Sequence, residues 1–464
     1  MSLAIVIMAA GKGTRLKSRR PKVLHAIGGK PLLGHVIAAA AKVVDAADIY
    51  VIVGHESERV RAAVAGTGVK FVEQAEQLGT GHAIKCAAPA IAGYDNFLVL
   101  SGDAPLIRPE TIALVRDFHA AEGAAMTLLS ALPENSYGYG RVLRKAPGSA
   151  EVASIVEEKA ATAEQKTVRE INSGMYGFRT SAVLKHLGEL RTDNPQAEYY
   201  LTDMAAILGR AGERVVAVAA PDANEILGAN TIAELVALDA EMRRKTAARL
   251  MALGVTIFKP ETCVIDAEVE IGPDTVVEPG VQILGASRIG SDCLIRTGSI
   301  LESAQLADNV LVRPYSLIVE STVGAGAKIG PFAHVRPGSE VGEEAHVGNF
   351  VEIKKVKLGQ GAKANHLTYL GDAEVGAATN IGAGVITCNY DGVNKHLTQI
   401  GAGVFVGSDS TLVAPLTVGD GAYIGAGSCI TQSVPGDALA VGRSRQVIRE
   451  GWAVGKRARL GKKE

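Results

Sequence analysis

The sequence is short of the residues that cross-link, anchor or strongly charge a protein. Five cysteines among 464 residues, odd in number and without a CxxC pair, predict neither a disulfide framework nor a zinc site and favour a reducing cytoplasm. A formal net charge of −1 argues against a general nucleic-acid-binding protein, because affinity for a phosphate backbone needs a large basic excess. No run reaches the roughly 18 uninterrupted apolar residues of a membrane helix, so we expect no membrane segment. Residues 1–8 lack the basic start and cleavage site of a signal peptide and predict a first β-strand.

A six-residue spacing of small aliphatic residues, many followed by glycine, runs through the second half. The positions are 265, 271, 277, 283, 289, 295 and 301, then 323, 329, 335, 341, 347 and 353, and then 400, 406, 412, 418, 424 and 430. Such a period predicts a left-handed parallel β-helix of about nine turns, because each short strand buries its aliphatic residue only by stacking on its neighbours. Gly-rich strands of a β-sandwich, the alternative, would not keep a fixed spacing. The register slips around 354–370 and 387–399, and we expect the chemistry of this half there.

The first half has a different pattern, in which apolar strands alternate with helices. Strands are expected at 3–8, 49–53, 69–72, 97–101 and 125–130, and helices at 31–44, 56–65 and 109–121. This alternation predicts a Rossmann-like, mostly parallel α/β sheet that binds ligands beyond the carboxyl ends of its strands. We therefore predict an α/β domain over 1–230, a linker helix over 231–250 and the β-helix domain over 251–464, which ends in a basic tail.

The loop after the first strand has the composition of a phosphate site. It reads Ala9-Ala10-Gly11-Lys12-Gly13-Thr14-Arg15 and is followed by Pro21-Lys22. Glycines let backbone N–H groups approach a phosphate, and Arg15 and Lys22 supply positive charge for oxygens on which charge develops. The loop lacks the GKS/T ending of a Walker A motif and the third glycine of a dinucleotide fingerprint.

Three ordered motifs resemble those of the sugar-1-phosphate nucleotidyltransferases. They are the loop above, 74–83 (QAEQLGTGHA) and 101–106 (SGDAPL). The resemblance implies attack of a sugar-1-phosphate oxygen on the α-phosphorus of a nucleoside triphosphate, which needs positioning and charge neutralisation. It implies Arg15 and Lys22 as catalytic cations and Mg²⁺ held by Asp103 and Asn224, with Asn230 as the alternative to Asn224. It also implies that the following residues bind the nucleotide and its sugar: Met8, Ala9, Ala10, Gly11, Lys22, Gln74, Gly79, Thr80, Ser101, Gly102, Asp103, Gly140, Glu157, Asn172 and Asn224.

Three positions depart from the motifs of that family. Ser101 stands where near relatives usually have Tyr, and Ala160 stands where an Asp commonly follows Lys159. The segment 223–226 (ANEI) also lacks the Arg that follows the family's second metal ligand.

The second half resembles hexapeptide acyltransferases that work as trimers with acyl-CoA between subunits. Its segments 347–355, 363–372, 380–384 and 387–392 follow in order. Together with the first half, they resemble the family of bifunctional N-acetylglucosamine-1-phosphate uridyltransferase/glucosamine-1-phosphate acetyltransferases over nearly the full length. The resemblance implies a homotrimer that makes UDP-N-acetylglucosamine, a precursor of cell-wall polymers, from UTP, acetyl-CoA and glucosamine-1-phosphate.

Within this half, His366 is the expected general base. An amine that attacks a thioester must lose a proton, and histidine is the side chain whose ordinary pKa lies near neutrality. The resemblance implies that glucosamine-1-phosphate is bound by Arg336, Lys354, Tyr369 and Asn380, and acetyl-CoA by Ala383, Asn389, Tyr390, Ser408, Ala426 and Arg443. Cys388 has no proposed role, although an exposed thiol here would make acetyl transfer sensitive to thiol reagents.

Two alternatives stay open at this point. One is a single-activity nucleotidyltransferase with a regulatory β-helix, and the other treats the hexads only as a trimerising scaffold. A pure scaffold has no reason to place His, Tyr, Asn and Lys in the register breaks. The basic tail, which is expected to be solvated and could bind anions, contains Arg443, Arg445, Arg449, Lys456, Arg457, Arg459, Lys462 and Lys463.

Overall fold

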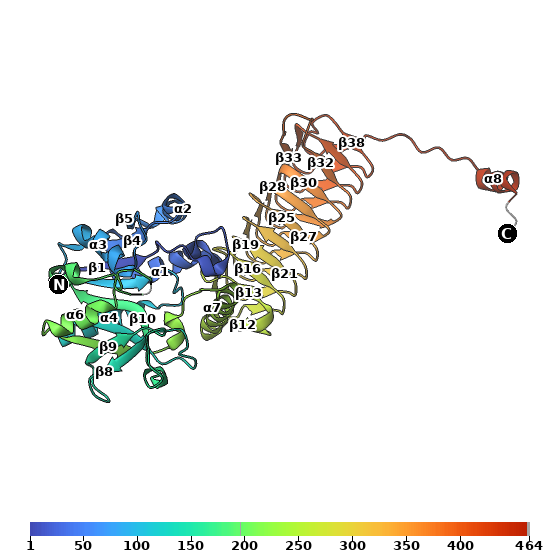
Figure 1. Cartoon of the computed structure of the whole chain (residues 1–464). Helices are drawn as coiled ribbons and strands as arrows, with labels where there is room; N and C mark the ends of the chain where they lie inside the picture. Colours follow the sequence, from blue (N-terminus) through green and yellow to red (C-terminus); the bar gives the residue numbers. More distant parts are fainter. Residues whose placement is uncertain (195, 462–464) are drawn as a thin grey trace. The chain divides into compact units, whose positions relative to one another are not determined.

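A computed structural model describes residues 1–194 and 196–461, which divide between two compact units, Met1–Met242 and Arg243–Glu464 (Figure 1). The helix predicted over 231–250 is confirmed as α7 (Ile232–Ala252), and the boundary between the units lies inside it. The predicted domain bounds themselves stay a prediction. No helix of the described residues is long and apolar enough to cross a membrane.

The first unit is built on a nine-stranded mixed sheet with the central order β11-β7-β10-β6-β1-β4-β5. β10 runs antiparallel to β6 and β7, and the hairpin β8–β9 extends the sheet from β10. The strands of this unit are β1 (Leu3–Met8), β2 (Ala26–Ile27), β3 (Lys30–Pro31), β4 (Ile49–Val53), β5 (Lys70–Glu73), β6 (Asn96–Ser101), β7 (Met126–Ala131), β8 (Arg141–Arg144), β9 (Val152–Val156), β10 (Ile171–Arg179) and β11 (Val215–Ala219).

Helices cover both faces of this sheet, as predicted. The helices are α1 (Leu32–Ala40), α2 (Ser57–Ala63), α3 (Thr80–Ile91), α4 (Pro109–Glu122), α5 (Thr180–His186) and α6 (Asp203–Arg210). α1, α2 and α4 pack on one face, and α3, α5 and α6 pack on the other. β1 shows why: Ile5 and Ile7 join one core and Ala4 and Val6 join the other, so a fully apolar strand is buried on both sides. The five predicted strands are confirmed as β1, β4, β5, β6 and β7.

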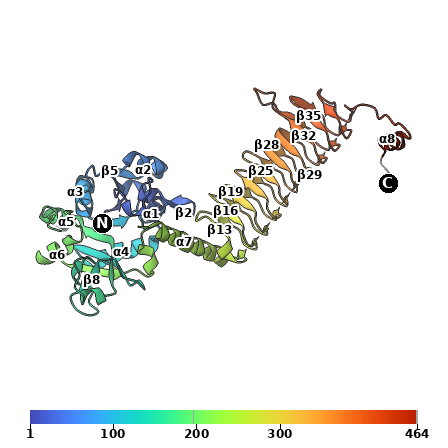
Figure 2. The same ribbon diagram turned by 45° about the vertical axis from the view of Figure 1, so that its right-hand side comes forward.

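The second unit is a stack of short parallel strands, which Figure 2 shows from a second direction. One sheet has eleven strands and another has seventeen. The strands are β12 (Thr256–Ile257), β13 (Val264–Ile265), β14 (Glu270–Ile271), β15 (Val276–Val277), β16 (Gln282–Leu284), β17 (Arg288–Ile289), β18 (Leu294–Ile295), β19 (Ile300–Glu302), β20 (Gln305–Leu306), β21 (Leu311–Val312), β22 (Leu317–Val319), β23 (Thr322–Val323), β24 (Lys328–Ile329), β25 (His334–Arg336), β26 (Glu340–Val341), β27 (His346–Asn349), β28 (Glu352–Leu358), β29 (Lys363–His366), β30 (Tyr369–Val375), β31 (Asn380–Ile381), β32 (Ile386–Cys388), β33 (Thr398–Ile400), β34 (Phe405–Val406), β35 (Thr411–Val413), β36 (Leu416–Val418), β37 (Tyr423–Ile424), β38 (Cys429–Ile430) and β39 (Leu439–Ala440).

The aliphatic residue of each hexad lies inside the stack, directly beneath that of the next coil. One such column contains Ile265, Ile283, Leu301, Ile318, Val335, Ile353 and Leu370, all at most 2% exposed. The burial that each side chain gains, about 1.5–3 kcal/mol, comes only from its neighbours in the stack. The predicted left-handed parallel β-helix is confirmed.

One detail of the predicted register is wrong. The stack is longer than nine turns, because coils through Leu306, Val312 and Ile318 continue where the hexad pattern seemed to pause. The slip predicted around 354–370 is confirmed as a shift of one residue near Leu358, after which β28, β29 and β30 continue to stack in register. The segment between β32 and β33, residues 389–397, leaves the coil as an excursion.

The basic tail continues beyond the β-helix and contains α8 (Trp452–Leu460). Its described side chains are exposed, apart from the half-buried Gly455, and Lys456 Nζ lies 4.8 Å from the centre of the Trp452 ring. Lys462 and Lys463, which belong to the predicted tail, lie outside the described residues.

Candidate active sites

In the first unit, the candidate nucleotide site lies where β1 and β6 end. Met8 and Ser101 are paired at these carboxyl ends, and the Gly102 N–H donates to the Met8 carbonyl at 3.0 Å. The Ala9 N–H donates to the Ile52 carbonyl at 2.9 Å, which fixes the start of the following loop to the edge of the sheet. Gly11 is exposed, and no atom lies within 4 Å of the place where a Cβ would sit, so its backbone is open to a ligand.

Four predicted polar residues meet beside this loop. Arg15 Nη2 and Lys22 Nζ both donate to Asn230 Oδ1, at 2.7 and 2.9 Å. Lys22 Nζ also forms an ion pair with Asp103 Oδ2, and the Lys22 and Asp103 side chains are only 17% and 21% exposed. Two cationic side chains and two side-chain oxygens that could coordinate a metal therefore meet at one place. This arrangement suits a triphosphate and a hard divalent cation.

Gly13 makes this approach of Lys22 possible. Its φ of +60° lies in the left-handed region, and a Cβ at Gly13 would come within 2.7 Å of Lys22 Cβ. A larger residue would thus be strained and would also push the lysine away from Asp103.

Asn224, the predicted second metal ligand, is not brought to this cluster by any described contact. It is exposed in the short helix η7 (Ala223–Ile226), whose next residue, Glu225, is 0% exposed. Glu225 accepts hydrogen bonds from Arg108 and Thr111 and so fixes this turn to the start of α4. Asn230, the alternative that the sequence left open, instead shares Lys22 Nζ with Asp103.

The sugar-side residues lie together: Gly140 directly precedes β8, Glu157 directly follows β9, and Asn172 is on β10. The Asn172 N–H donates to the Gly140 carbonyl at 2.8 Å, and a Cβ on Gly140 would lie 3.5 Å from both Glu157 carboxylate oxygens. Burial, with a smaller effect of nearby Asp203, raises the pKa of Glu157 above its ordinary value. The Asn172 amide also donates to Tyr176 Oη at 2.8 Å, which orients it.

The predicted base-reading loop is fixed by hydrogen bonds of the side chains of Gln74 and Thr80. Gln74 is 3% exposed, and its Nε2 donates to the Gly79 carbonyl at 3.0 Å. Thr80 Oγ1 accepts from the Leu201 N–H at 3.1 Å, which ties the loop to the segment before α6. The side chains of Gln74 and Thr80 thus shape the loop.

In the second unit, His366 and three predicted acetyl-CoA residues form one column along the β-helix. The members of this column, in order, are Asn349, His366, Ala383, Ser408 and Ala426. Successive members are linked by backbone hydrogen bonds: the N–H of the residue that follows one member donates to the carbonyl of the previous member. Arg443 lies at the end of this column, since a Cβ on Gly427 would be 3.8 Å from Arg443 Cδ. The members of the column after His366, which are Ala383, Ser408 and Ala426, all have small side chains.

Asn349 orients the candidate base and had no role in the sequence analysis. Its Oδ1 lies 2.7 Å from His366 Nδ1 and, being a carbonyl oxygen, accepts the Nδ1 hydrogen. The lone pair of the exposed ring is then on Nε2. Asn349 lies within the quoted segment 347–355, but only the pairing of β27 with β29 shows which residue it faces.

The predicted phosphate-binding residues are neighbours on β25, β28 and β30. Arg336 pairs with Lys354 in register, and Arg336 Nη1 donates to Glu352 Oε1 at 2.7 Å. The neighbouring Lys395 ammonium is the largest cause of a lowered pKa of Lys354. Lys395 therefore belongs to the same cationic group, which two lysines and an arginine would form around a phosphate.

Tyr369 lies over the backbone of β30 beside these cations. A Cβ on Gly371 would meet the Tyr369 hydroxyl, so the ring lies directly on the glycine backbone. Asn380 lies on β31 between Lys363 of β29 and Phe405 of β34, on another sheet.

The remaining predicted residues lie on the excursion before β33. Asn389 is 7% exposed and its amide donates to Asp372, so it anchors the excursion, whereas Tyr390 is 59% exposed. Cys388 is half-buried, and burial raises the pKa of its thiol, which lowers the reactive thiolate fraction. Its sensitivity to thiol reagents stays a prediction.

Comparison with known proteins agrees with this pair of sites. A MobA-like NTP transferase domain matches residues 5–169, a GMPPB C-terminal domain matches 259–360, and bacterial transferase hexapeptide repeats match 397–432. The bifunctional protein GlmU of Koribacter versatilis is 58% identical over 462 residues, covering 99% of this chain and 98% of the relative. The chain belongs to the GlmU family.

Other GlmU proteins are similar over the same length. That of Solibacter usitatus is 51% identical over 462 residues, and that of Pelobacter propionicus is 46% identical over 455 residues, each covering 98% of the relative. Membership of the GlmU family confirms the predicted bifunctional enzyme of UDP-N-acetylglucosamine synthesis, with a uridyltransferase and an acetyltransferase. The single-activity and scaffold alternatives are thereby set aside.

Proposed function

We propose that His366 and the column that continues from it carry acetyl transfer from acetyl-CoA to glucosamine-1-phosphate, and that the Arg15, Lys22, Asp103 and Asn230 cluster carries uridylyl transfer from UTP. The observation that supports this most is the column itself. It aligns a histidine with a free Nε2 lone pair and a track of small side chains that leads to Arg443.

In the acetyl site, Arg336, Lys354 and Lys395 hold the sugar phosphate, with Tyr369 and Asn380 at the sugar. His366 Nε2 takes a proton from the sugar ammonium group, and the amine attacks the thioester carbonyl. A C–N bond forms, the C–S bond breaks, and the coenzyme A sulfur leaves and takes up a proton. Ala383, Ser408 and Ala426 line the pantetheine chain, Asn389 and Tyr390 lie beside the thioester, and Arg443 is suited to a phosphate of the coenzyme.

Asn349 acts as a positioning residue in this step. Asn349→Ala is expected to lower kcat for acetyl transfer about tenfold while KM for both substrates stays within a factor of two, because the ring loses the partner that fixes its tautomer. Asn349→Asp keeps an oxygen acceptor and is expected to recover most of kcat. Steady-state kinetics test this, with Gln399→Ala, an exposed change on β33, as the control. Equal losses in the Ala and Asp variants would contradict the role.

In the uridylyl site, the loop 9–13 and the cations Arg15 and Lys22 hold the triphosphate for in-line attack by the sugar phosphate oxygen. Asp103 and Asn230 offer the hard oxygen atoms that Mg²⁺ prefers, and Mg²⁺ when bound neutralises charge on the phosphates. Gly140, Glu157 and Asn172 contact the N-acetylglucosamine, and Gln74, Gly79 and Thr80 shape the pocket for the base. Release of pyrophosphate completes the transfer, and the five free cysteines suit a cytoplasmic enzyme.

A homotrimer is supported by an exposed apolar ladder next to the column. Tyr315, Phe332 and Phe350 stack at ring-centre distances of 5.5 and 5.4 Å, and each is 49–57% exposed. Leu367, the residue after His366, continues the ladder and is 64% exposed. A patch of this kind suits an interface, and the hexapeptide fold is compatible with oligomers.

Phe332→Asp is expected to convert the trimer into monomers, because a carboxylate would be placed in a desolvated interface. Multi-angle light scattering measures the change in mass. Leu132→Asp, at a 59% exposed apolar residue of the first unit, is the matched control and should keep the wild-type mass. A wild-type protein that is monomeric, or a Phe332→Asp protein of unchanged mass, would contradict this interface.

A further inference from the structure

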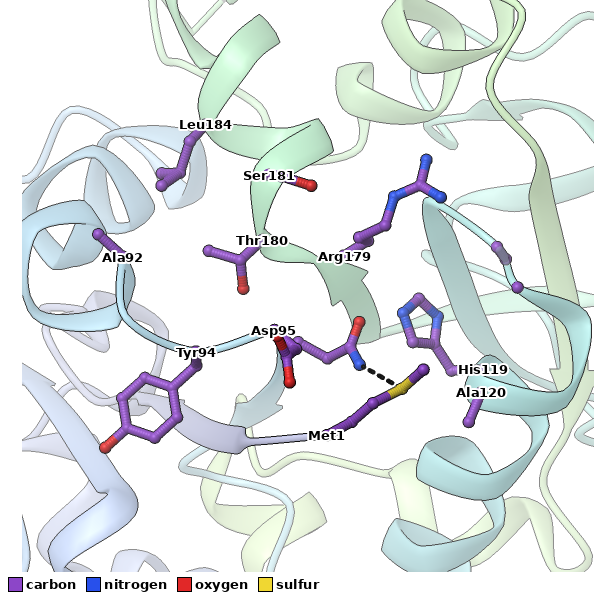
Figure 3. A pocket seen from close by; sticks show the side chains of 13 residues that line it. Met1, Ala92, Tyr94, Asp95, His119, Ala120, Arg179, Thr180, Ser181 and Leu184 are labelled. Atoms are coloured by element: carbon purple, nitrogen blue, oxygen red, sulfur yellow. Dashed lines mark hydrogen bonds between the residues drawn. The ribbon is translucent and has the colours of Figure 1, made fainter.

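The first unit contains a cavity that neither proposed reaction uses. Its volume is about 460 Å³, and it lies at the start of β6, the end of α4 and the junction of β10 with α5 (Figure 3). The uridylyl residues Met8 and Ser101 lie at the other ends of β1 and β6. Six residues of a strand span about 20 Å, so the cavity is at the opposite edge of the sheet.

Two deeply buried polar atoms at this cavity have no partner in the described structure. They are Nε2 of His119, a residue 3% exposed, and Oγ1 of Thr180, a residue 2% exposed. Figure 3 shows the His119 ring directed into the space bounded by Arg179, Asp95 and Met1. A buried donor or acceptor that has no hydrogen-bond partner costs free energy. Such atoms beside a cavity therefore indicate that a partner is missing.

The hydrogen-bonding of the ring identifies what that partner must offer. His119 Nδ1 lies 2.8 Å from Oγ1 of Thr127, which is 0% exposed. Burial, and then the charge of Arg179, lower the pKa of His119 to about 4, so the ring is neutral near pH 7. A buried hydroxyl hydrogen needs an acceptor, and Nδ1 is the acceptor that the described residues place beside the Thr127 hydroxyl, so we assign the donation to Thr127. The Nε2 atom then carries the ring hydrogen and donates into the cavity.

The other polar groups around the cavity are the Arg179 guanidinium, the Asp95 carboxylate and the Asn96 side-chain amide, whose Nδ2 donates to Met1 Sδ at 3.6 Å. The Arg179 guanidinium pairs through one nitrogen with Glu213, and its side chain stays 39% exposed. Asp95, the carboxylate at the cavity, accepts a hydrogen bond at Oδ2 from the Ser2 N–H at 2.7 Å. Ala124 and Leu184 form apolar wall. Donors from His119, Thr180 and Arg179 thus converge in a space large enough for a small organic molecule.

We propose that this cavity binds a small oxyanion-bearing metabolite, whose carboxylate or phosphate oxygens accept hydrogen bonds from His119 Nε2, Thr180 Oγ1 and the Arg179 guanidinium. The site is remote from the uridylyl residues of the same unit and does not depend on their roles. A carboxylate and a phosphate share this chemistry, and the experiment separates them.

Thr180→Val tests the site, because it removes one donor and keeps the shape of the side chain. It is expected to raise Tm of the free protein slightly, since an unpaired buried hydroxyl is lost, and to weaken the ligand at least tenfold. Thr398→Val in the second unit is the matched control, because Thr398 is 0% exposed and its Oγ1 also has no described partner. It should raise Tm in the same way without changing affinity.

Citrate and glycerol 3-phosphate serve as the carboxylate and phosphate probes, each titrated by thermal shift against the wild-type protein and both variants. Anion binding at the catalytic sites is common to all three proteins, so a difference between Thr180→Val and the others belongs to the cavity. Crystals soaked with each probe should show its oxygens beside His119 Nε2. Equal affinities in all three proteins for both probes, or only water beside Nε2, would overturn the proposal.

Discussion

His366→Ala is expected to lower kcat for acetyl transfer by about 10²- to 10⁴-fold and to leave uridylyl transfer unchanged. The amine of glucosamine-1-phosphate is protonated near neutral pH, and without Nε2 no group in the column can take its proton. The release of coenzyme A measures the first activity and the release of pyrophosphate measures the second, on one preparation of the variant. Uridylyl transfer is thus the internal control for folding.

Chemical rescue separates a base from a merely structural histidine. Because His366 is exposed, added imidazole can reach the space left by the alanine and is expected to restore part of kcat. A variant with wild-type acetyl transfer would remove His366 from the mechanism. A variant that is correctly assembled but inactive, and whose activity imidazole does not restore, would give His366 a purely structural role.

The β-helix could be predicted because its information is local and repeated. A residue such as Ile353 is buried by the residues one coil before and after it, so the six-residue spacing already contains the packing rule. The shift of one residue near Leu358 defeats a strict count of six, although the coil continues through it. Strand pairing tolerates such a shift when the next aliphatic residue still points inward.

Positioning residues were harder to predict because their partners are distant in sequence. Asn349 and His366 are 17 residues apart, and they meet only because one coil stacks on the next. Lys395 reaches Lys354 from the excursion before β33, whose path depends on the buried Asn389. A motif contains these residues, but the tertiary structure decides which of them touch.

The two asparagines near the end of the first unit show the same limit more sharply. Matching by residue type favours Asn224, although Asn224 and Asn230 each follow an alanine. The burial of Glu225 against Arg108 and Thr111 instead turns the chain so that Asn230 reaches Arg15 and Lys22. This difference leads to a prediction with a matched control inside one loop.

Asn230→Ala is expected to lower uridylyl transfer by about 10- to 100-fold at limiting Mg²⁺, whereas Asn224→Ala stays close to wild type. Acetyl transfer should be unchanged in both variants. The physical reason is the shared oxygen: Asn230 Oδ1 holds Arg15 and Lys22 in place, and Lys22 in turn pairs with Asp103. Pyrophosphate release, measured across a range of Mg²⁺ concentrations, gives both kcat and the apparent affinity for the metal.

The dependence on Mg²⁺ decides whether Asn230 is a ligand or only an anchor for the two cations. A lost ligand weakens metal affinity, so the activity of Asn230→Ala should recover as Mg²⁺ is raised, and Asn230→Asp should need less Mg²⁺ than the alanine variant. A loss of kcat that no concentration of Mg²⁺ restores would make Asn230 a positioning residue for Arg15 and Lys22. A loss in Asn224→Ala with a wild-type Asn230→Ala would return the metal to the residue that the motif alone selects.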